Sequence, residues 1–155
     1  MKQKLDRAVD FFLAMLVIGM TIVVGISVFY RYVLNQPLSW TEEITRLMVV
    51  WLSFVGAYMA MREDKHIGFD LFVKYFSPGP RKAVALGGQA LIALFLLVVV
   101  WEGFIFSWEF LYVPMPYTDI PVGWFYYTVL PVSGALMLAQ TILNILEIFH
   151  AREKA

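Results

Sequence analysis

Four long runs without a charged side chain constrain the fold of this 155-residue chain more than any other feature. An α-helix rises about 1.5 Å per residue, so about 20 residues cross the ~30 Å hydrocarbon core of a bilayer. The chain is 61% hydrophobic and 15% charged, which is too apolar for an ordinary soluble domain. We therefore predict an all-α integral membrane protein. The uncharged runs cover residues 11–30, 47–61, 83–101 and 120–146.

Four transmembrane helices in a single membrane domain are expected from these runs. The second run has only fifteen residues, so its helix must extend to Arg46 and Arg62, whose side chains snorkel toward the two interfaces. Pro131 is expected to kink the fourth helix. Small residues spaced by four allow close helix packing, as at Thr21 and Gly25 or at Ala83 and Gly87. The expected spans are about 10–31, 40–62, 83–108 and 121–147.

The segment between the second and third spans has a polar stripe at helical spacing. Its members are His66, Asp70, Lys74 and Ser77. Apolar and aromatic residues cover the remaining surface. We expect one short amphipathic interfacial helix at about residues 66–77, ended by the Ser-Pro-Gly-Pro sequence at 77–80. Its apolar face suits either the membrane surface or another subunit.

Basic residues are distributed unequally between the two sides of the predicted membrane domain. Ten lysines and arginines lie in the N-terminal tail, the loop between spans two and three, and the C-terminal tail. Only Arg31 and Arg46 lie on the other side. The positive-inside rule places the ten in the cytoplasm. We expect a multi-pass membrane protein with both termini cytoplasmic.

The polar segment at residues 31–46 is the candidate functional segment. The sequence Asn-Gln-Pro at 35–37 ends the first helix, because proline cannot donate a backbone hydrogen bond. Ser39 followed by Glu42 predicts a capping box that opens the second helix. Glu42 and Arg46 are four apart with the acid first, which favours an ion pair on one helix face. The segment is either an ordinary polar helix start or a docking surface for other chains, with about equal weight.

Acidic residues outnumber basic ones on the side expected to face outward. Two arginines stand against five acids there: Glu42, Glu43, Glu102, Glu109 and Asp119. An acidic rim can steer a basic periplasmic partner. The positive-inside rule alone also leaves acids outside, and the two explanations carry equal weight. Similar membrane depth motivates one further hypothesis, that Arg31 or Arg46 pairs with Glu102 across helices.

Residue patterns for catalysis or cofactor binding are absent from the sequence. The chain has no cysteine, and its two histidines, His66 and His150, lie outside the four runs, which argues against a haem protein. A solvated loop explains His66 better than a metal site does. The sequence contains no glycine-rich phosphate loop or nucleophile elbow. We expect no enzyme, no cofactor, no metal and no nucleic-acid partner.

Amide side chains are few in the spans, and ionisable groups are missing from the middle of every span. The amides are Gln89, Gln140 and Asn144. We expect them to hydrogen-bond between helices rather than to bind a substrate. Four spans without a polar interior favour a scaffold over a self-sufficient carrier.

Several motifs in order resemble one transporter family. They are Arg31-Tyr-Val-Leu-Asn35-Gln-Pro-Leu-Ser-Trp40-Thr-Glu-Glu43, then Arg46, Trp51, Gly56-Ala57, Arg62 and His66-Ile-Gly-Phe-Asp70. This order, over nearly the whole chain, resembles the DctQ-like small membrane subunit of TRAP transporters, the tripartite ATP-independent periplasmic carriers.

The resemblance implies an accessory role in ion-gradient-driven symport. A large multi-span permease subunit would carry the substrate and sodium sites, and a periplasmic substrate-binding protein would deliver an organic acid such as a sialic acid or a dicarboxylate. The small subunit would be a non-catalytic scaffold, surrounded by membrane lipids, and part of the docking face. On this chain the resemblance assigns outer docking and cohesion to Arg31, Trp40, Glu42, Glu43 and Arg46. It assigns the structure of the inner loop to Arg62, His66 and Asp70.

Other classes of protein remain as alternatives. The first is a self-contained four-helix exporter that acts as a homodimer; small multidrug exporters of that kind place a buried glutamate in their first span, and residues 11–30 contain none. A membrane enzyme or electron-transfer subunit is disfavoured by the histidine count. An assembly factor or lipid-binding scaffold is disfavoured by the motif resemblance alone.

Overall fold

The computed structural model describes residues 2–63 and 78–150. The expected interfacial helix at 66–77 therefore lies outside the described residues. Four helices are long and apolar enough to cross a membrane, which confirms the prediction of an all-α protein with four spans. The elements in chain order are α1 (Lys2–Tyr32), α2 (Ser39–Glu63), α4 (Pro78–Glu109), the π-helical turn η1 (Gly123–Tyr127) and α5 (Val129–His150).

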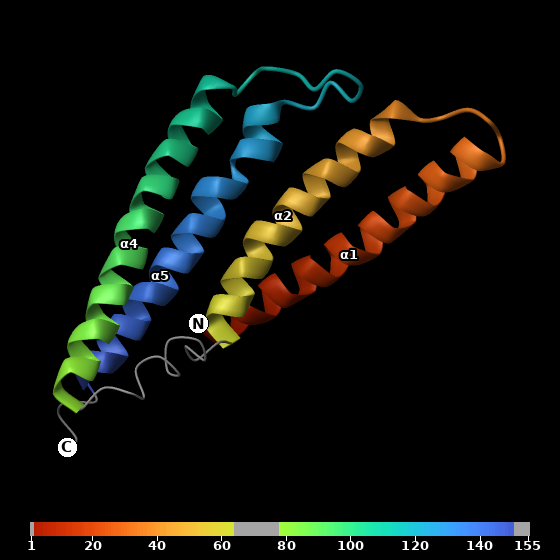
Figure 1. The fold of residues 1–155 in the computed structure, drawn as a ribbon. Coiled ribbons are helices and arrows are strands. Elements are labelled where there is room, and N and C mark those ends of the chain that lie inside the picture. Colours follow the sequence, from red (N-terminus) through yellow and green to blue (C-terminus); the bar gives the residue numbers. More distant parts are fainter. Residues whose placement is uncertain (1, 64–77, 151–155) are drawn as a thin grey trace.

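The described helices form a single row rather than a closed bundle (Figure 1). α1 and α2 make one hairpin, and α4 and α5 make the other. α5 packs against α2, so the order across the row is α4, α5, α2, α1. Within the described ranges, α1 has no backbone contact with α4 or α5. We call the end of the molecule formed by residues 33–38 and 110–122 the loop end, and the opposite end, where α1 begins, the terminal end.

A single row leaves most of each helix uncovered by the rest of the chain. In the most apolar window of each span, between 6% and 28% of the residues are buried. Along α4, six large side chains are at least 62% exposed: Leu91, Leu94, Phe95, Trp101, Phe104 and Trp108. Apolar area of this extent is stable only against lipid or another apolar protein surface.

The two hairpins are joined through one face of α2. Val55 and Tyr58 are each 3% exposed and pack with Val9 and Leu13 of α1. Leu136 and Met137 of α5 pack against the same cluster.

Trp51 of α2 adds a polar link, because its Nε1 donates a hydrogen bond to the Phe125 carbonyl oxygen at 2.6 Å. α2 is therefore the element that holds α1 and α5 together.

Glycines allow α4 and α5 to approach closely, at positions that the sequence analysis did not select. A Cβ on Gly123 would lie 2.5 Å from the Leu111 Cα, and one on Gly103 would lie 2.7 Å from the Leu130 Cβ. In contrast, a Cβ on Gly25 or Gly87 would have no atom within 4 Å. The predicted small-residue pairs that contain Gly25 and Gly87 are thus not packing positions within this chain.

The prolines at 78–80 and at 131 affect the helices at positions that differ slightly from those expected from the sequence. The Pro-Gly-Pro sequence at 78–80 forms the first turn of α4 instead of only ending the preceding segment. Proline suits a first turn, because its missing N–H has no partner there. Pro131 lies in the first turn of α5, and the helical irregularity is the π-helical turn η1 immediately before it. Proline removes an i to i−4 hydrogen bond, which favours such an irregularity one turn earlier.

The close approach at Gly123 gives a stability prediction. Gly123→Ala should lower the free energy of unfolding by about 1–3 kcal/mol, because the new methyl group overlaps backbone atoms that cannot move aside. Gly25→Ala is the matched control, since its methyl group meets open space. Thermal unfolding of the purified chain in detergent, followed by tryptophan fluorescence, measures both. Equal midpoints for the two variants would contradict the packing argument.

Candidate functional site

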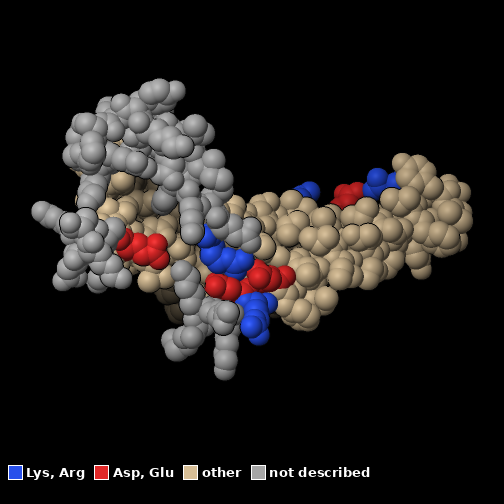
Figure 2. Space-filling model, turned by 90° about the horizontal axis from the view of Figure 1, so that it is seen from below, with Lys and Arg blue, Asp and Glu red and all other residues tan. Residues whose placement is uncertain are grey.

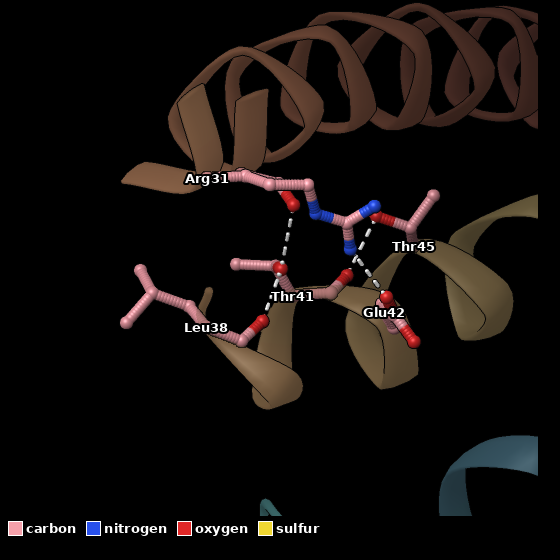
Figure 3. A network of polar contacts seen from close by, with 6 residues as sticks. Arg31, Leu38, Thr41, Glu42 and Thr45 are labelled. Carbon is pink, nitrogen blue, oxygen red and sulfur yellow. Dashed lines mark hydrogen bonds and ion pairs between the residues drawn. The ribbon is translucent and has the colours of Figure 1, made fainter. Parts of the chain in front are cut away.

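The loop end carries a polar network between α1 and α2 (Figure 3). α1 ends at Tyr32, and Asn35 takes a left-handed backbone conformation with φ of 53°, which asparagine tolerates better than most residues. This turn brings Arg31 opposite the first turn of α2. Its guanidinium donates a hydrogen bond to the Glu42 carboxylate at 2.6 Å. Both side chains are about half exposed, so the pair contributes about 0–1 kcal/mol.

A buried threonine completes this network. Thr41 is 1% exposed, and its hydroxyl donates to the Leu38 carbonyl oxygen at 2.6 Å. The same hydroxyl lies 3.0 Å from the Ser27 hydroxyl of α1. The Thr45 hydroxyl donates to the Thr41 carbonyl oxygen at 2.7 Å. These hydroxyl groups are therefore satisfied within the chain, which fixes the start of α2 against α1.

The predicted capping box and the predicted ion pair within α2 are wrong. α2 does begin at Ser39, but the Glu42 carboxylate binds Arg31 of the neighbouring helix. Within the described ranges, no hydrogen bond or ion pair joins the Arg46 side chain to another residue. Arg46 and Trp40 both have exposed side chains. The partner across the hairpin is preferred because the turn at 33–38 places Arg31 closer to the carboxylate.

The hypothesis that Arg31 or Arg46 pairs with Glu102 is not supported by the structure. Arg31 is engaged with Glu42. Glu102 lies on α4, which packs against α5 and η1 and has no backbone contact with α1 or α2 among the described residues. Similar membrane depth is therefore not enough, because α4 and α1 lie at opposite edges of the row.

Glu43 holds the loop between α4 and α5. Its carboxylate accepts hydrogen bonds from the N–H groups of Tyr117 and Thr118, at 3.1 and 3.0 Å. The Thr118 hydroxyl donates to the same carboxylate at 2.9 Å. Hydrogen bonds to a charged acceptor are about twice as strong as neutral ones. One side chain of α2 thus fixes a loop that is 74 residues away in sequence.

The loop held by Glu43 is a small hairpin. Pro114 and Pro121 form an isolated antiparallel bridge, and the Met115 N–H donates to the Ile120 carbonyl oxygen at 2.9 Å. Asp119 has a φ of 54°, a left-handed value that closes the turn. Tyr117 at its tip is 66% exposed. The hairpin therefore presents an aromatic side chain on a backbone that α2 holds in place.

A cavity of about 190 Å³ lies between this hairpin and α2. Glu43 and Arg46 line one side of it, and Met115, Tyr126 and Tyr127 line the other. Among the described residues, no group of three or more His, Cys, Asp or Glu side chains lies together as a metal site. The arrangement joins α2 to the loop hairpin and to η1.

A second polar cluster lies at the terminal end. The Arg62 guanidinium of α2 lies 3.0 Å from the Asp10 carboxylate and 3.5 Å from the Asp6 carboxylate of α1. The Tyr58 hydroxyl also lies 3.3 Å from Asp6. Figure 2, which views the molecule from below, shows basic and acidic side chains gathered at this end. The Arg62 side chain is 13% exposed, and both carboxylates that it contacts among the described residues belong to α1.

Sequence reasoning selected Arg62 but missed its two acidic partners. Asp6 and Asp10 are four apart, so they share one face of α1. That spacing was the available signal, and counting only the basic residues of the N-terminal tail concealed it. His66 and Asp70, the other two residues assigned to the inner loop, lie outside the described residues.

The amide side chains differ from the expectation in one respect. Gln140 Nε2 donates to the Asn144 Oδ1 at 2.9 Å, and both residues belong to α5. Gln89 on α4 is buried, with 4% exposure. The bond between Gln140 and Asn144 therefore satisfies two amides within one helix rather than between helices.

Comparisons with known proteins agree on one family. Residues 20–151 match the family model described as "Tripartite ATP-independent periplasmic transporters, DctQ component". A Haemophilus influenzae protein named "Putative TRAP transporter small permease protein" is 32% identical over 74 residues, 48% of this chain and 46% of that protein. The C4-dicarboxylate TRAP transporter small permease protein of Vibrio cholerae is 29% identical over 105 residues, 68% of this chain and 44% of that protein.

A third relative has another substrate in its name. The sialic acid TRAP transporter small permease protein of Vibrio cholerae is 23% identical over 115 residues, 74% of this chain and 66% of that protein. The matches thus span between 44% and 66% of the lengths of these three relatives.

The Glu43 contacts predict the order of the loop hairpin. Glu43→Ala should speed amide hydrogen exchange at Tyr117 and Thr118 roughly tenfold or more, because a hydrogen bond to a charged group contributes about 1.5–3 kcal/mol. Hydrogen-exchange mass spectrometry of the chain in micelles measures this. Glu42→Ala removes the neighbouring carboxylate and should leave both amides protected. If the hairpin amides exchange equally fast in the wild-type chain and in Glu43→Ala, Glu43 does not hold the hairpin.

The Arg62 cluster predicts a charge-swap result. Arg62→Asp and Asp10→Arg should each lower the free energy of unfolding by about 1–3 kcal/mol, a value between those of exposed and buried pairs. The double variant should regain a large part of the loss. Arg62→Asp combined with Glu109→Arg is the control, since it restores net charge without restoring the contact. Additive losses in the double variant would show that the ion pair contributes nothing.

Proposed function

Because the chain belongs to the DctQ component family of tripartite ATP-independent periplasmic transporters, we propose that it is the small, non-catalytic membrane subunit of an ion-gradient-driven transporter for organic acids. The names of two relatives, one for C4-dicarboxylates and one for sialic acid, support a carboxylate substrate. Substrate and coupling ions would bind to a separate large permease subunit.

A scaffold role for the large subunit is supported chiefly by the single row of helices. A closed four-helix bundle covers its own apolar face, whereas this row leaves large side chains bare along α4 and along α1. The most exposed stretch, from Leu91 to Trp108, extends over most of a span. A static partner helix seated there would gain a broad contact area, and the row would hold that partner at a fixed depth in the membrane.

The loop end is the proposed docking surface for a periplasmic substrate-binding protein. Arg31, Trp40, Glu42 and Arg46 have exposed side chains there, and Glu43 fixes the adjacent hairpin. The excess of basic residues at the opposite end supports an orientation with cytoplasmic termini in the bacterial inner membrane. The loop end would then face the periplasm.

Co-purification tests the assembly. The tagged chain, extracted in mild detergent from membranes that also contain the products of its neighbouring genes, should retain a multi-span membrane protein at a fixed ratio. The same tag on an unrelated four-span protein is the control. A homodimer without a partner that moves a solute across proteoliposomes would overturn the proposal and favour the self-contained exporter.

The docking assignment has its own test in the same system. With the reconstituted complex, Glu43→Ala should raise the concentration of binding protein required for half-maximal uptake severalfold, because the hairpin loses its fixed position. Co-purification of the large subunit should be unchanged. Glu147→Ala, which removes an exposed carboxylate of α5 at the terminal end, is the control for general damage. An unchanged requirement for binding protein in Glu43→Ala would contradict the docking role.

A further inference from the structure

A second and larger cavity lies between α1 and α2 at the loop end, with a volume of about 580 Å³. This size is within the range of ordinary small-molecule sites. Its walls change character along the hairpin. Counted from the turn at 33–38, Arg31, Thr41 and Glu42 lie nearest the loop end, Arg46 lies about as deep as Val24, and Val49 and Val50 lie deepest. The lining thus changes from polar near the loop end to apolar at its deepest part, an order that suits an amphiphilic molecule.

The two arginines that line the cavity differ in whether an acidic side chain balances their charge. The charge of Arg31 is balanced by Glu42, 2.6 Å away. Arg46 has no ion pair or hydrogen bond from its side chain within the described ranges. It lies seven residues after Ser39, so it is about 10 Å along the axis of a membrane-spanning helix. An arginine at that depth requires an anionic or strongly polar partner, which its long side chain reaches by snorkelling toward the interface.

Other polar groups at the mouth are already used. The Thr45 hydroxyl donates to the Thr41 carbonyl oxygen, and the Thr41 hydroxyl donates to that of Leu38 (Figure 3). The guanidinium of Arg46 is consequently the principal donor left for a ligand. A guanidinium binds phosphate oxygens with two parallel hydrogen bonds, which makes a phosphodiester a well-matched anion.

The valines that line the cavity indicate which chemical group of the ligand accompanies the anion. Val24, Val28 and Val49 are 41%, 50% and 43% exposed although they line a cavity, so the chain does not cover them. An acyl chain would cover these valines and would exclude water from them. A free phosphate ion would leave them bare.

We propose that the cavity between α1 and α2 binds one phospholipid, with its phosphate on Arg46 and an acyl chain along the valines. The cavity is formed by these two helices alone, so the site does not depend on any other subunit or on the proposed transport function. The bound lipid would fill the α1–α2 hairpin near the loop end and would compensate Arg46, which has no ion pair among the described residues.

Native mass spectrometry and thermal unfolding of the purified chain test the proposal. After extensive exchange into lipid-free detergent, mixed micelles that carry phosphatidylethanolamine or phosphatidylglycerol are added. We expect one phospholipid per wild-type chain and a rise in the unfolding midpoint. Diacylglycerol with the same acyl chains lacks the phosphate, and inorganic phosphate lacks the chains. Neither should raise the midpoint.

Two variants and one control separate the parts of the site. Arg46→Gln should weaken phospholipid binding at least tenfold, whereas Arg7→Gln, which removes an exposed charge outside the cavity, should not change it. Val28→Trp should block the apolar part while Arg46 is retained, and it keeps the test decisive if Arg46→Gln folds poorly.

Three results would overturn the proposal. The first is equal phospholipid binding by the wild-type chain, Arg46→Gln and Val28→Trp. The second is stabilisation by inorganic phosphate that equals that by phospholipid, which would mean an anion site without an acyl chain. The third is a wild-type chain that binds no phospholipid, while Arg46→Gln abolishes co-purification of another membrane protein. Arg46 would then pair with an acidic group of that protein.

Discussion

Helices in a membrane satisfy their own backbone hydrogen bonds, so they do not need a second layer of protein to exclude water. The rest of this structure depends on that constraint. In water, a single row of four helices with bare phenylalanine and tryptophan side chains along α4 would collapse or aggregate. In a bilayer the same row is stable with a narrow band of internal contacts. The row in turn leaves wide apolar faces that lipid or a second protein can cover.

Because so little apolar area is buried within the chain, specific contacts decide how the helices are arranged. α2 makes most of them. It is tied to α1 at both ends, through Glu42 with Arg31 and through Arg62 with Asp10. It is tied to the second hairpin through Trp51 and Glu43, which bind backbone groups near the start of α5 and in the preceding loop. The residues that hold the fold together are therefore largely the residues of the candidate functional site.

The contacts between α4 and α5 are of another kind. They depend on the absence of side chains at Gly103 and Gly123, where added atoms would overlap the neighbouring helix or the loop. The α4–α5 hairpin is thus held by close backbone packing, whereas the α1–α2 hairpin is held by the apolar cluster around Val55 and by polar contacts at its two ends. The α1–α2 hairpin is the one that contains the larger cavity.

The sequence by itself determined the all-α class, the four spans, the turn after Tyr32 and the membership of Glu42, Glu43 and Arg62 in polar clusters. These follow from local properties: run length, proline chemistry, and the cost of a charge in the membrane. Only the tertiary structure decided the partners of those residues. Glu43 binds a loop 74 residues away, and Arg62 binds Asp10 52 residues away. Such pairings depend on which helices are neighbours in the row, and no periodicity within one helix encodes that order.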